Sequence, residues 1–324
     1  MVQAGRIITK YVSIADYSQS YYFVDTVYRK YWEPLHASTN PIITSEMMEN
    51  EIWQLDVWLR VPTSIITDRS LVRGSAYANL PSHPPGEFYP VGFESSLITS
   101  PGFYSSGYFK KLEPFTDYTF LHSGAQLYGG YVVLNRPLSA NEALAVTYSA
   151  GTPERVYGST VYGDTANNGD IILKLIKPDQ ELSPLIKPAW DLQIRSVYST
   201  DIKYPRPDNF DFHIYKEAGG RRDEDVLGVP LLRVVGLDRF DQALNPIPDG
   251  RFDFLPNLTI DLERGDIIFP TLRPFDSTIV QYFREASTVV PDSLLFHELY
   301  DATRSVVTSH PPMYGLRIRQ AVLE

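Results

Sequence analysis

Hydrophobic and polar residues alternate along much of the chain with a period of two. The clearest run spans residues 54–61, where Leu55 and every second residue up to Val61 are apolar. This period is typical of a half-buried β-strand, and Pro62 predicts its end. Similar patterns predict other strands, which lie at residues 6–12, 70–78, 143–148, 189–198, 209–216 and 314–322, the last as an edge strand. Two more, within 155–176, flank the hairpin-like turn Asn167-Asn168-Gly169.

The pattern is densest between residues 229 and 275. An apolar run (231–235) ends at Gly236, and two strand-like runs follow at 258–262 and 266–270. Asp-Gly and Arg-Gly pairs between them are turn signals, because glycine accepts a positive φ and aspartate bonds its own backbone. We therefore expect a β-meander here, with a structural motif formed by Gly236, Asp249, Gly250, Phe252, Gly265 and Pro270.

Residues 109–138 and 252–275 follow the same pattern. Each has an aromatic residue, a Leu-Pro or Leu-x-Pro step, a strand, a glycine turn, a second strand and a proline near its end. A truncated third copy can be placed at Gly5-Arg6-Ile7-Ile8. Such repetition favours an extended protein of several β modules. The alternative is that any two hairpins resemble each other at this level of detail.

Three stretches depart from the alternation. Near the C-terminus, Leu295, Leu299, Ala302 and Val306 share one helical face and predict a helix over 293–307. The aromatic stretch from residue 21 to 32 fits either a helix or a strand. Residues 63–106 are rich in Pro, Gly and Ser, which predicts one strand and a long loop. The loop is either ordered, and then binds something or packs on a neighbour, or it is a flexible linker.

Composition agrees with an all-β chain of several antiparallel meanders or sandwiches. There are 22 Tyr, 25 Pro and only 4 Met among 324 residues. At about 100–200 residues per domain, we expect two or three domains. We place them at 1–106 (with the Pro/Gly-rich loop), 107–228 (a central β module) and 229–324 (the meander with its helix).

Charge and residue chemistry exclude several classes of function. The net charge of −10 argues against nucleic acid as a partner. No cysteine is present, no run is long and apolar enough for a transmembrane helix, and residues 1–15 lack the pattern of a signal peptide. The six histidines lie without metal-ligand spacing, at positions 36, 83, 122, 213, 297 and 310. We expect neither a catalytic residue nor an organic cofactor.

Carboxylates and aromatic residues supply the remaining candidates. Paired carboxylates for glycoside hydrolysis could come from Asp191, Asp211, Asp253 and Asp261. Oxygen ligands crowded at short spacing could bind Ca²⁺, and here they are Asp238, Asp241, Asn245, Asp249 and Asp253. The alternative for the second set is a network of turns in which these side chains cap backbone N–H groups. Aromatic residues at 21–32 and 103–109 could bind sugar rings or a partner chain, and the alternative is that they belong to the core or to an interface.

Several motifs resemble the SprA family of type 9 secretion and gliding-motility proteins. In the central stretch these are Leu237-Asp238-Arg239, Pro248-Asp249-Gly250, Phe252-Asp253-Phe254, Gly265 with 267–270, and Pro274-Phe275. Further matches are 117–119, 130–134, 143–148, 190–192, 197–198 and 298–304. The similarity runs through residues 105–305 and is looser before them. The chain departs from the family pattern Glu-Pro-Phe-Gly at residues 272–276.

The resemblance implies a segment of a very large outer-membrane translocon for folded proteins, with a plug protein and a lipoprotein shuttle as partners. The largest known pores of this kind need roughly 360 residues in strands alone, so this chain would be a soluble periplasmic or cell-surface segment, or a shortened homologue. The expected function is therefore that of a non-enzymatic scaffold or partner-binding β module in an exported protein. The alternatives are a carbohydrate-binding or carbohydrate-active β-sandwich, with Trp32 and Trp190 as sugar platforms, and a surface module stiffened by Ca²⁺.

Overall fold

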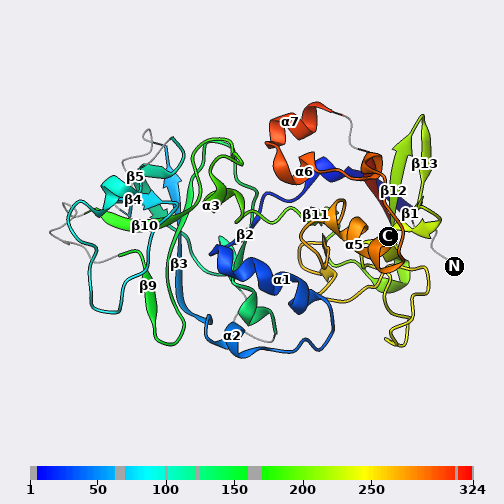
Figure 1. Ribbon diagram of the computed structural model, residues 1–324, viewed down its shortest axis with the longest axis horizontal. Coiled ribbons are helices and arrows are strands. Elements are labelled where there is room, and N and C mark those ends of the chain that lie inside the picture. Colours follow the sequence, from blue (N-terminus) through cyan, green and yellow to red (C-terminus); the bar gives the residue numbers. More distant parts are fainter. Residues whose placement is uncertain are drawn as a thin grey trace. The chain divides into compact units, whose positions relative to one another are not determined.

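The structure is a computed structural model that describes residues 6–62, 70–98, 101–120, 125–159, 170–310 and 313–322. It consists of two compact units, each assembled from stretches that are separate in sequence (Figure 1). Unit 1 contains Met1–Ser18, His36–Thr39 and Arg195–Glu324, and unit 2 contains Gln19–Leu35 and Asn40–Ile194. These boundaries differ from the three consecutive modules expected from the sequence.

Unit 2 is built on a six-stranded sheet of order β10-β4-β5-β3-β8-β9, in which β10 also pairs with β8, so that the sheet closes on itself. A smaller sheet has the order β2-β7-β6. The strands of unit 2 are β2 (Tyr21–Phe23), β3 (Ile52–Val61), β4 (Val72–Tyr77), β5 (Tyr104–Lys111), β6 (Tyr118–Phe120), β7 (Tyr131–Leu134), β8 (Leu144–Ala150), β9 (Arg155–Tyr157) and β10 (Ile171–Lys177). Its α-helices are α1 (Arg29–His36), α2 (Ser45–Met48) and α3 (Lys187–Trp190).

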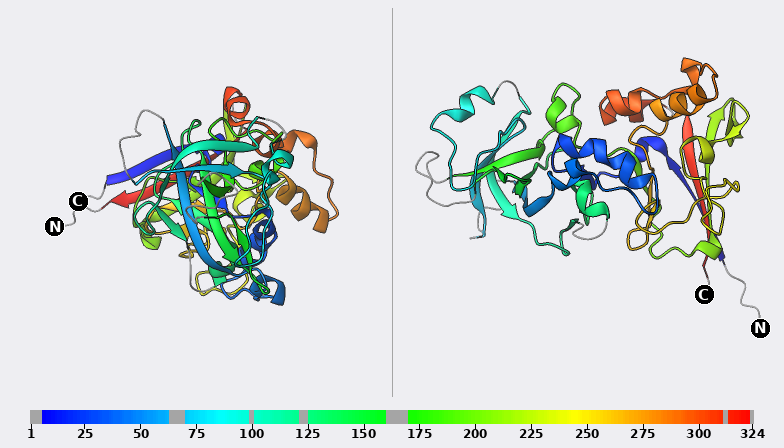
Figure 2. Two further views of the ribbon diagram at one scale, coloured as in Figure 1. Left: turned by 90° about the vertical axis from the view of Figure 1, so that its left-hand side faces the viewer. Right: turned by 60° about the horizontal axis from the view of Figure 1, so that its bottom comes forward.

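Unit 1 is built on a four-stranded sheet of order β1-β18-β12-β13, and β1 and β18 lie side by side in Figure 2. Its smaller sheets are β11-β17-β16 and the pair β14-β15. The strands are β1 (Arg6–Ser13), β11 (Val197–Ser199), β12 (Phe210–Ala218), β13 (Arg221–Asp223), β14 (Asp225–Val226), β15 (Val229–Pro230), β16 (Ile260–Asp261), β17 (Asp266–Ile268) and β18 (Tyr314–Val322). The helices are α4 (Leu231–Val234), α5 (Ser277–Glu285), α6 (Glu298–Asp301) and α7 (Arg304–Ser309).

The two units repeat one strand order. The antiparallel run β1-β18-β12-β13 of unit 1 corresponds to β10-β8-β3-β5 of unit 2, and the small sheet β11-β17-β16 corresponds to β2-β7-β6. Along the chain, the first repeat consists of the long strand β1 followed by a body that contains β2 to β9. The second repeat consists of the long strand β10 followed by a body that contains β11 to β18. Each long strand joins the sheet of the other body: β1 pairs with β18, and β10 pairs with β8. The exchange explains why unit 1 combines the N-terminal residues 1–18 with residues 195–324.

Local bonding supports the equivalence. Residues 7–12 (Ile-Ile-Thr-Lys-Tyr-Val) match residues 171–176 (Ile-Ile-Leu-Lys-Leu-Ile). The lysine of each segment forms an ion pair with the aspartate that follows the first body strand of the other repeat. These ion pairs are Lys10 with Asp201 and Lys174 with Asp25.

The turns repeat as well. In the small sheets, Val24 N donates to Gly130 O at 2.8 Å and Thr200 N donates to Gly265 O at 3.1 Å. Before each hairpin, the residue that follows a proline has a positive φ, 64° at Phe115 and 62° at Asn257. The predicted repeat of residues 109–138 in 252–275 is thus confirmed for its hairpins, residues 114–134 and 256–268, but not for its start, because Phe109 lies on β5 and Phe252 lies in a loop. The truncated third copy was wrong: the segment at Ile7 and Ile8 corresponds to the start of β10, not to the hairpin.

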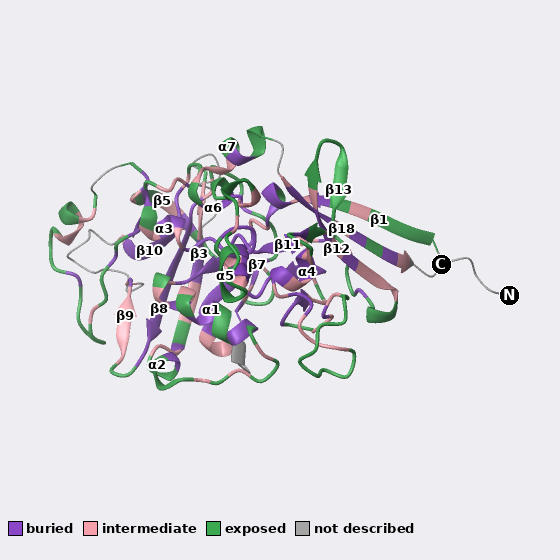
Figure 3. Cartoon of the chain, turned by 45° about the vertical axis from the view of Figure 1, so that its right-hand side comes forward, coloured by how far each residue is buried: buried purple, intermediate pink, exposed green. Residues whose placement is uncertain are grey.

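Each unit has its own hydrophobic core. In unit 1 the core gathers the inner faces of β12 and β18 with helices α4 to α7, and Phe269, Phe275 and Leu299 are fully buried. In unit 2 the interior of the closed sheet contains Trp58, Ala145 and Leu173. The two units differ in how far their strands are buried: Figure 3 shows that β1 of unit 1 is mainly exposed, whereas β8 and β10 of unit 2 are buried.

The fold is predominantly β, as expected, with antiparallel pairing dominant and short helices near the C-terminus. Alternation identified β3, β12 and β18 correctly. The edge position of β18 was wrong, because β18 lies between β1 and β12. Residues 189–198 were also wrong as a single strand, since α3 ends at Trp190 and β11 begins at Val197.

Two corrections concern helices. The apolar run 231–235 is helix α4 rather than the first strand of a meander, so only β16 and β17 form the hairpin there. The helix over 293–307 is broken into a 3₁₀ turn, α6 and α7, because Leu295 and Ala302 adopt extended backbone with ψ of 140° and 159°. The described chain has further helices that the sequence did not predict, notably α5.

The two open stretches are now placed. The aromatic segment 21–32 contains both a strand, β2, and the start of a helix, α1. The described part of the Pro/Gly-rich region packs on the sheet through Leu80 and Tyr89, which supports an ordered loop. The Asn167-Asn168-Gly169 turn lies outside the described residues. Among the described helices, none has the length and apolar character needed to cross a membrane.

Candidate functional site

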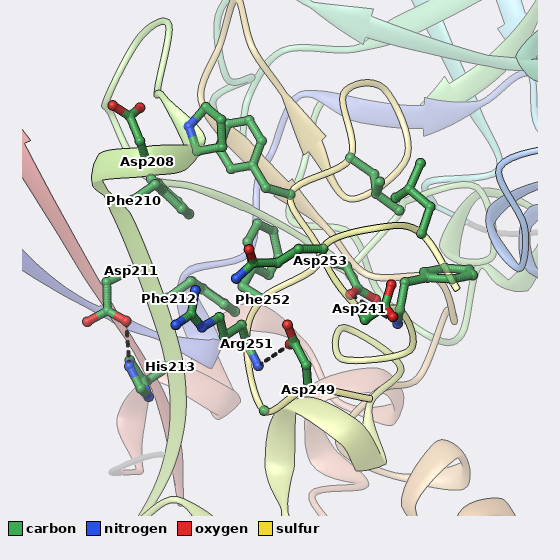
Figure 4. Close-up of a pocket in the computed structure, with 17 residues that line it drawn as sticks. Asp208, Phe210, Asp211, Phe212, His213, Asp241, Asp249, Arg251, Phe252 and Asp253 are labelled. Atoms are coloured by element: carbon green, nitrogen blue, oxygen red, sulfur yellow. Dashed lines mark hydrogen bonds and ion pairs between the residues drawn. The ribbon is translucent and has the colours of Figure 1, made fainter. Parts of the chain in front are cut away.

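A hollow of unit 1 with a volume of about 720 Å³ is formed by the beginning of β12 and the loop 240–255 (Figure 4). Its aromatic side comes from two strand-like segments in which every second residue is phenylalanine. Phe210 and Phe212 lie on β12, and Phe252 and Phe254 lie on the loop. Their ring centroids are 5.0 to 6.4 Å apart, so the four rings pack mainly on one another and on the core.

The loop that forms the rest of the hollow is held by aspartates. Asp238 is fully buried, and its Oδ1 accepts hydrogen bonds from Asp249 N at 2.8 Å and Gly250 N at 3.1 Å. Asp253 accepts from Arg239 N at 2.7 Å and from Phe240 N at 3.2 Å. These bonds fix the two ends of the loop, since each carboxylate satisfies amides that would otherwise be unpaired.

The tip of the loop uses the same device. Asp241 accepts hydrogen bonds from the backbone N–H groups of Ala243 and Asn245, each at 2.9 Å, and from Asn245 Nδ2 at 2.8 Å. Asp249 accepts from Arg251 N at 3.0 Å. Hydrogen bonds from Asn245 and Ala243 lower the pKa of Asp241, whereas burial raises the pKa of Asp253 despite its two backbone bonds.

All five residues expected to bind Ca²⁺ therefore take part in the hydrogen bonds that form the turns of the loop. Their hydrogen bonds match the alternative of a capping network. Among the described residues, the only group of three or more metal-binding side chains whose ligand atoms lie within 4.8 Å of one another is elsewhere, at Asp276, His297 and Asp301. Calcium binding by the loop remains a prediction.

The structural motif is brought together in part. Gly236 has φ of 80°, and a Cβ placed there would lie 3.0 Å from Pro270 Cγ, so these two motif residues are neighbours. Gly265 has φ of 71°, and a Cβ there would lie 1.9 Å from Ile202 O. Only glycine fits that second position.

The Asp276, His297 and Asp301 group was not found from the sequence. His297 Nδ1 lies 2.6 Å from Asp276 Oδ1, and Arg273 lies between the acids, 2.6 Å from Asp276 and 2.9 Å from Asp301. The Arg273 guanidinium already supplies a cation to these carboxylates. The hydrogen bond to Asp292 raises the pKa of His297 against the opposing effect of burial. The four-residue step from His297 to Asp301 was the one spacing signal, and it could not show Asp276, which lies 21 residues before His297.

The four carboxylates considered for glycoside hydrolysis do not form one site. Asp191 belongs to unit 2 and pairs with Lys187 at 2.7 Å, and Asp261 caps the turn at Glu263. Asp211 and Asp253 both line the hollow, where Asp211 binds His213 Nε2 at 2.7 Å. Of the aromatic candidates, Trp32 and Trp190 are buried in unit 2 and cannot stack on a sugar.

A comparison with protein-family models finds no match for this chain, and a comparison with curated proteins finds none either.

Proposed function

We propose that the chain is a non-enzymatic scaffold and partner-binding β module of an exported, SprA-like secretion or gliding protein on the periplasmic or cell-surface side of the outer membrane. The observation that carries the proposal is the construction of the hollow in unit 1. Asp241 and Asp253 accept hydrogen bonds from backbone amides, Asp211 is paired with His213, and the phenylalanines pack on one another, which makes a shaped surface.

The hollow lies in the segment with the strongest resemblance to that family. Pro248-Asp249-Gly250 and Phe252-Asp253-Phe254 carry the resemblance, and residues 249–254 all line the hollow. The backbone N–H groups of Asp249 and Gly250 donate hydrogen bonds to Asp238, so these motif residues hold the loop together. A rigid loop beside a partly exposed aromatic cluster is suited to binding another protein, because little order has to be gained on binding.

A photo-crosslinking experiment tests the proposal in a bacterium with type 9 secretion. A photoreactive phenylalanine analogue at Leu244, which is exposed and lines the hollow, should cross-link to one discrete envelope protein. The same analogue at Val289, which is also exposed in unit 1 but outside the hollow, should not. Equal, diffuse cross-linking from both positions would contradict the proposal. So would turnover of a substrate by the purified chain that a single change, Asp211→Asn or Asp253→Asn, abolishes.

One feature keeps carbohydrate binding as the second candidate, namely that the hollow combines aromatic side chains with Asp211 and Asp253. A sugar would have to contact Phe240 or Phe252 there, since the two tryptophans first considered are buried. Glycan-array binding that is lost on Phe240→Ala and kept on Phe88→Ala, a change at an exposed phenylalanine of unit 2, would favour this candidate.

A further inference from the structure

The outer edge of β1 is open, whereas the equivalent edge of β10 is covered. In unit 2, β4 pairs with β10 in parallel, with Ile171 opposite Gly74 and Leu173 opposite Ala76. In unit 1, β18 pairs with one edge of β1, and no described strand pairs with the other. The repeat thus contains its own example of a strand bound at this edge.

The side chains at the two edges also differ in exposure, being covered on β10 and exposed on β1. Ile171 and Leu175 are 1% and 0% exposed, because β4 and the closed sheet cover them. Their counterparts Ile7 and Tyr11 are 56% and 50% exposed. Unpaired backbone groups beside exposed apolar side chains form a template for strand addition, which native proteins usually block or use.

Charge indicates what the missing strand carries. In unit 2, Arg73 of β4 lies 3.3 Å from Asp170, the residue immediately before β10. The residue of unit 1 that corresponds to Asp170 is Arg6, which is exposed and has no ion pair among the described residues. The charge at this position is therefore reversed, and a strand that binds β1 as β4 binds β10 needs an acidic residue where β4 has Arg73.

The same charges disfavour a second copy of this chain as the occupant. Two β1 strands paired in antiparallel fashion about Ile8 would place Arg6 opposite Lys10 at both ends. Like charges directly opposite each other destabilise a strand pair. β1 contains no acidic residue that could compensate.

We propose that the open edge of β1 binds an extended, acidic segment of another protein as a parallel strand, with a carboxylate facing Arg6 and small residues opposite Ile7 and Thr9. This inference rests on the proposed function as a partner-binding module and specifies one of its binding surfaces. The backbone geometry is available: Ile172 exchanges both of its hydrogen bonds with Ser159, so Ile171 and Leu173 direct theirs to β4. By equivalence, the N–H of Thr9 points to the open edge.

The natural absence of cysteine allows a test by disulfide trapping. The probe is a synthetic peptide with the sequence of residues 70–78, in which Gly74→Cys supplies a thiol and Arg73→Glu supplies the acid. The full chain carrying Ile7→Cys is equilibrated with it in a glutathione redox buffer, and the trapped fraction is measured by mass spectrometry. We expect about fivefold more trapping than with the peptide that keeps Arg73, because one favourable cross-strand charge pair replaces a repulsive one.

Three controls make the outcome decisive. Adding Arg6→Glu to the chain should reverse the preference between the two peptides, and moving the peptide cysteine from position 74 to 77 should reduce trapping at least tenfold. Thr9→Pro removes the outward N–H and should also reduce trapping at least tenfold, whereas Thr9→Ala should not. Far-UV circular dichroism verifies that each variant is folded.

Equal trapping of all peptides would overturn the inference, and dominant homodimers of the Ile7→Cys chain would show that a second copy is the occupant. Either result leaves the hollow of unit 1 untouched. If the cross-link at Leu244 persists while trapping fails, the open edge is refuted and the partner-binding function stands.

Discussion

Units 1 and 2 share one arrangement of strands, but one face of the main sheet is buried in unit 2 and exposed in unit 1. In unit 2 that face bears Trp58, Ala145 and Leu173, and it forms the core of the closed sheet. In unit 1 the corresponding positions are His213, Arg317 and Thr9, and the face is open to solvent. The strand that closes unit 2, β4, approaches β10 through Gly74, where a Cβ would lie 2.5 Å from the Ile171 side chain. Small residues thus let β4 approach β10 closely, and no described strand of unit 1 takes the corresponding place beside β1.

The two equivalent ion pairs show the energetic side of this difference. Lys174 and Asp25 are 9% and 16% exposed and lie 2.7 Å apart, and Tyr148 also donates to Asp25 at 2.7 Å. Lys10 and Asp201 are 31% and 77% exposed. Burial would raise the pKa of Asp25, but the charge and hydrogen bond of Lys174 outweigh it and lower the pKa. The equivalent lysine–aspartate ion pair is therefore buried in unit 2 and largely exposed in unit 1.

The largest effect is expected from Asp25→Ala. Removing one member of a buried pair leaves a buried charge without its partner and should lower the free energy of unfolding by about 3–5 kcal/mol. The matched change Asp201→Ala should cost about 0–1 kcal/mol. All four tryptophans lie in unit 2, so their fluorescence in a urea titration reports this unit alone, while circular dichroism reports both. Equal losses for the two variants would break the comparison.

A second test asks whether the repeated turns are equally strict. A Cβ at Gly130 would lie 2.1 Å from Tyr28 Cγ, and a Cβ at Gly265 would lie 1.9 Å from Ile202 O. Gly130→Ala and Gly265→Ala should each cost more than about 3 kcal/mol through strain and steric overlap. Gly250→Ala is the control, since its φ is also positive but no atom lies within 4 Å, and it should cost about 1 kcal/mol in a urea titration.

Local pattern predicted individual strands such as β3 and β12 well, because their apolar residues recur with the period of an extended chain. It could not predict that β1 pairs with β18, whose residues lie some three hundred positions away, since alternation carries no information about the partner. It also could not distinguish helix from strand in the short apolar run at Leu231, which tertiary packing decides. The exchange of long strands between repeats has no local signal at all.

The sequence predicted some of the residues of the candidate site, but not how they are arranged. The sequence showed that Asp238, Asp249 and Asp253 are crowded together, and the structure places Asp249 and Asp253 at the hollow with Asp238 bonded to the same loop. Whether their oxygens face a cation or backbone amides depends on the path of the loop. The contributions of Phe210 and Phe212 from β12 follow from contacts across more than thirty residues.

The pH dependence of stability should also differ between the two units, but by a smaller amount. The pKa of His297 is raised by its hydrogen bond to Asp292, so the stability it contributes to unit 1 is fully present below the unfolded value near 6.5 and is lost as pH rises through the folded value. His297→Gln should therefore lower the thermal midpoint of unit 1 at pH 5.5 and have no effect at pH 9. Because the pKa of Asp25 is lowered, its contribution to unit 2 is constant over this range and is lost only in acid. Circular dichroism melts of both proteins at the two pH values test this, and an effect that grows with pH would contradict it.

The smallest effect is expected from Ca²⁺, and its absence would be informative. The carboxylates of Asp238 and Asp253 already accept two backbone hydrogen bonds each, and a cation would have to compete with those amides for the same oxygens. We therefore expect 1 mM CaCl₂ or a chelator to change the thermal midpoint of unit 1 by less than about 1 °C. A site filled at a hundred times its dissociation constant would instead add about 2.7 kcal/mol to stability. A rise in the midpoint that Asp241→Asn abolishes would show that the loop rearranges to bind the ion, and unit 1 would then owe its rigidity to a ligand rather than to its turns.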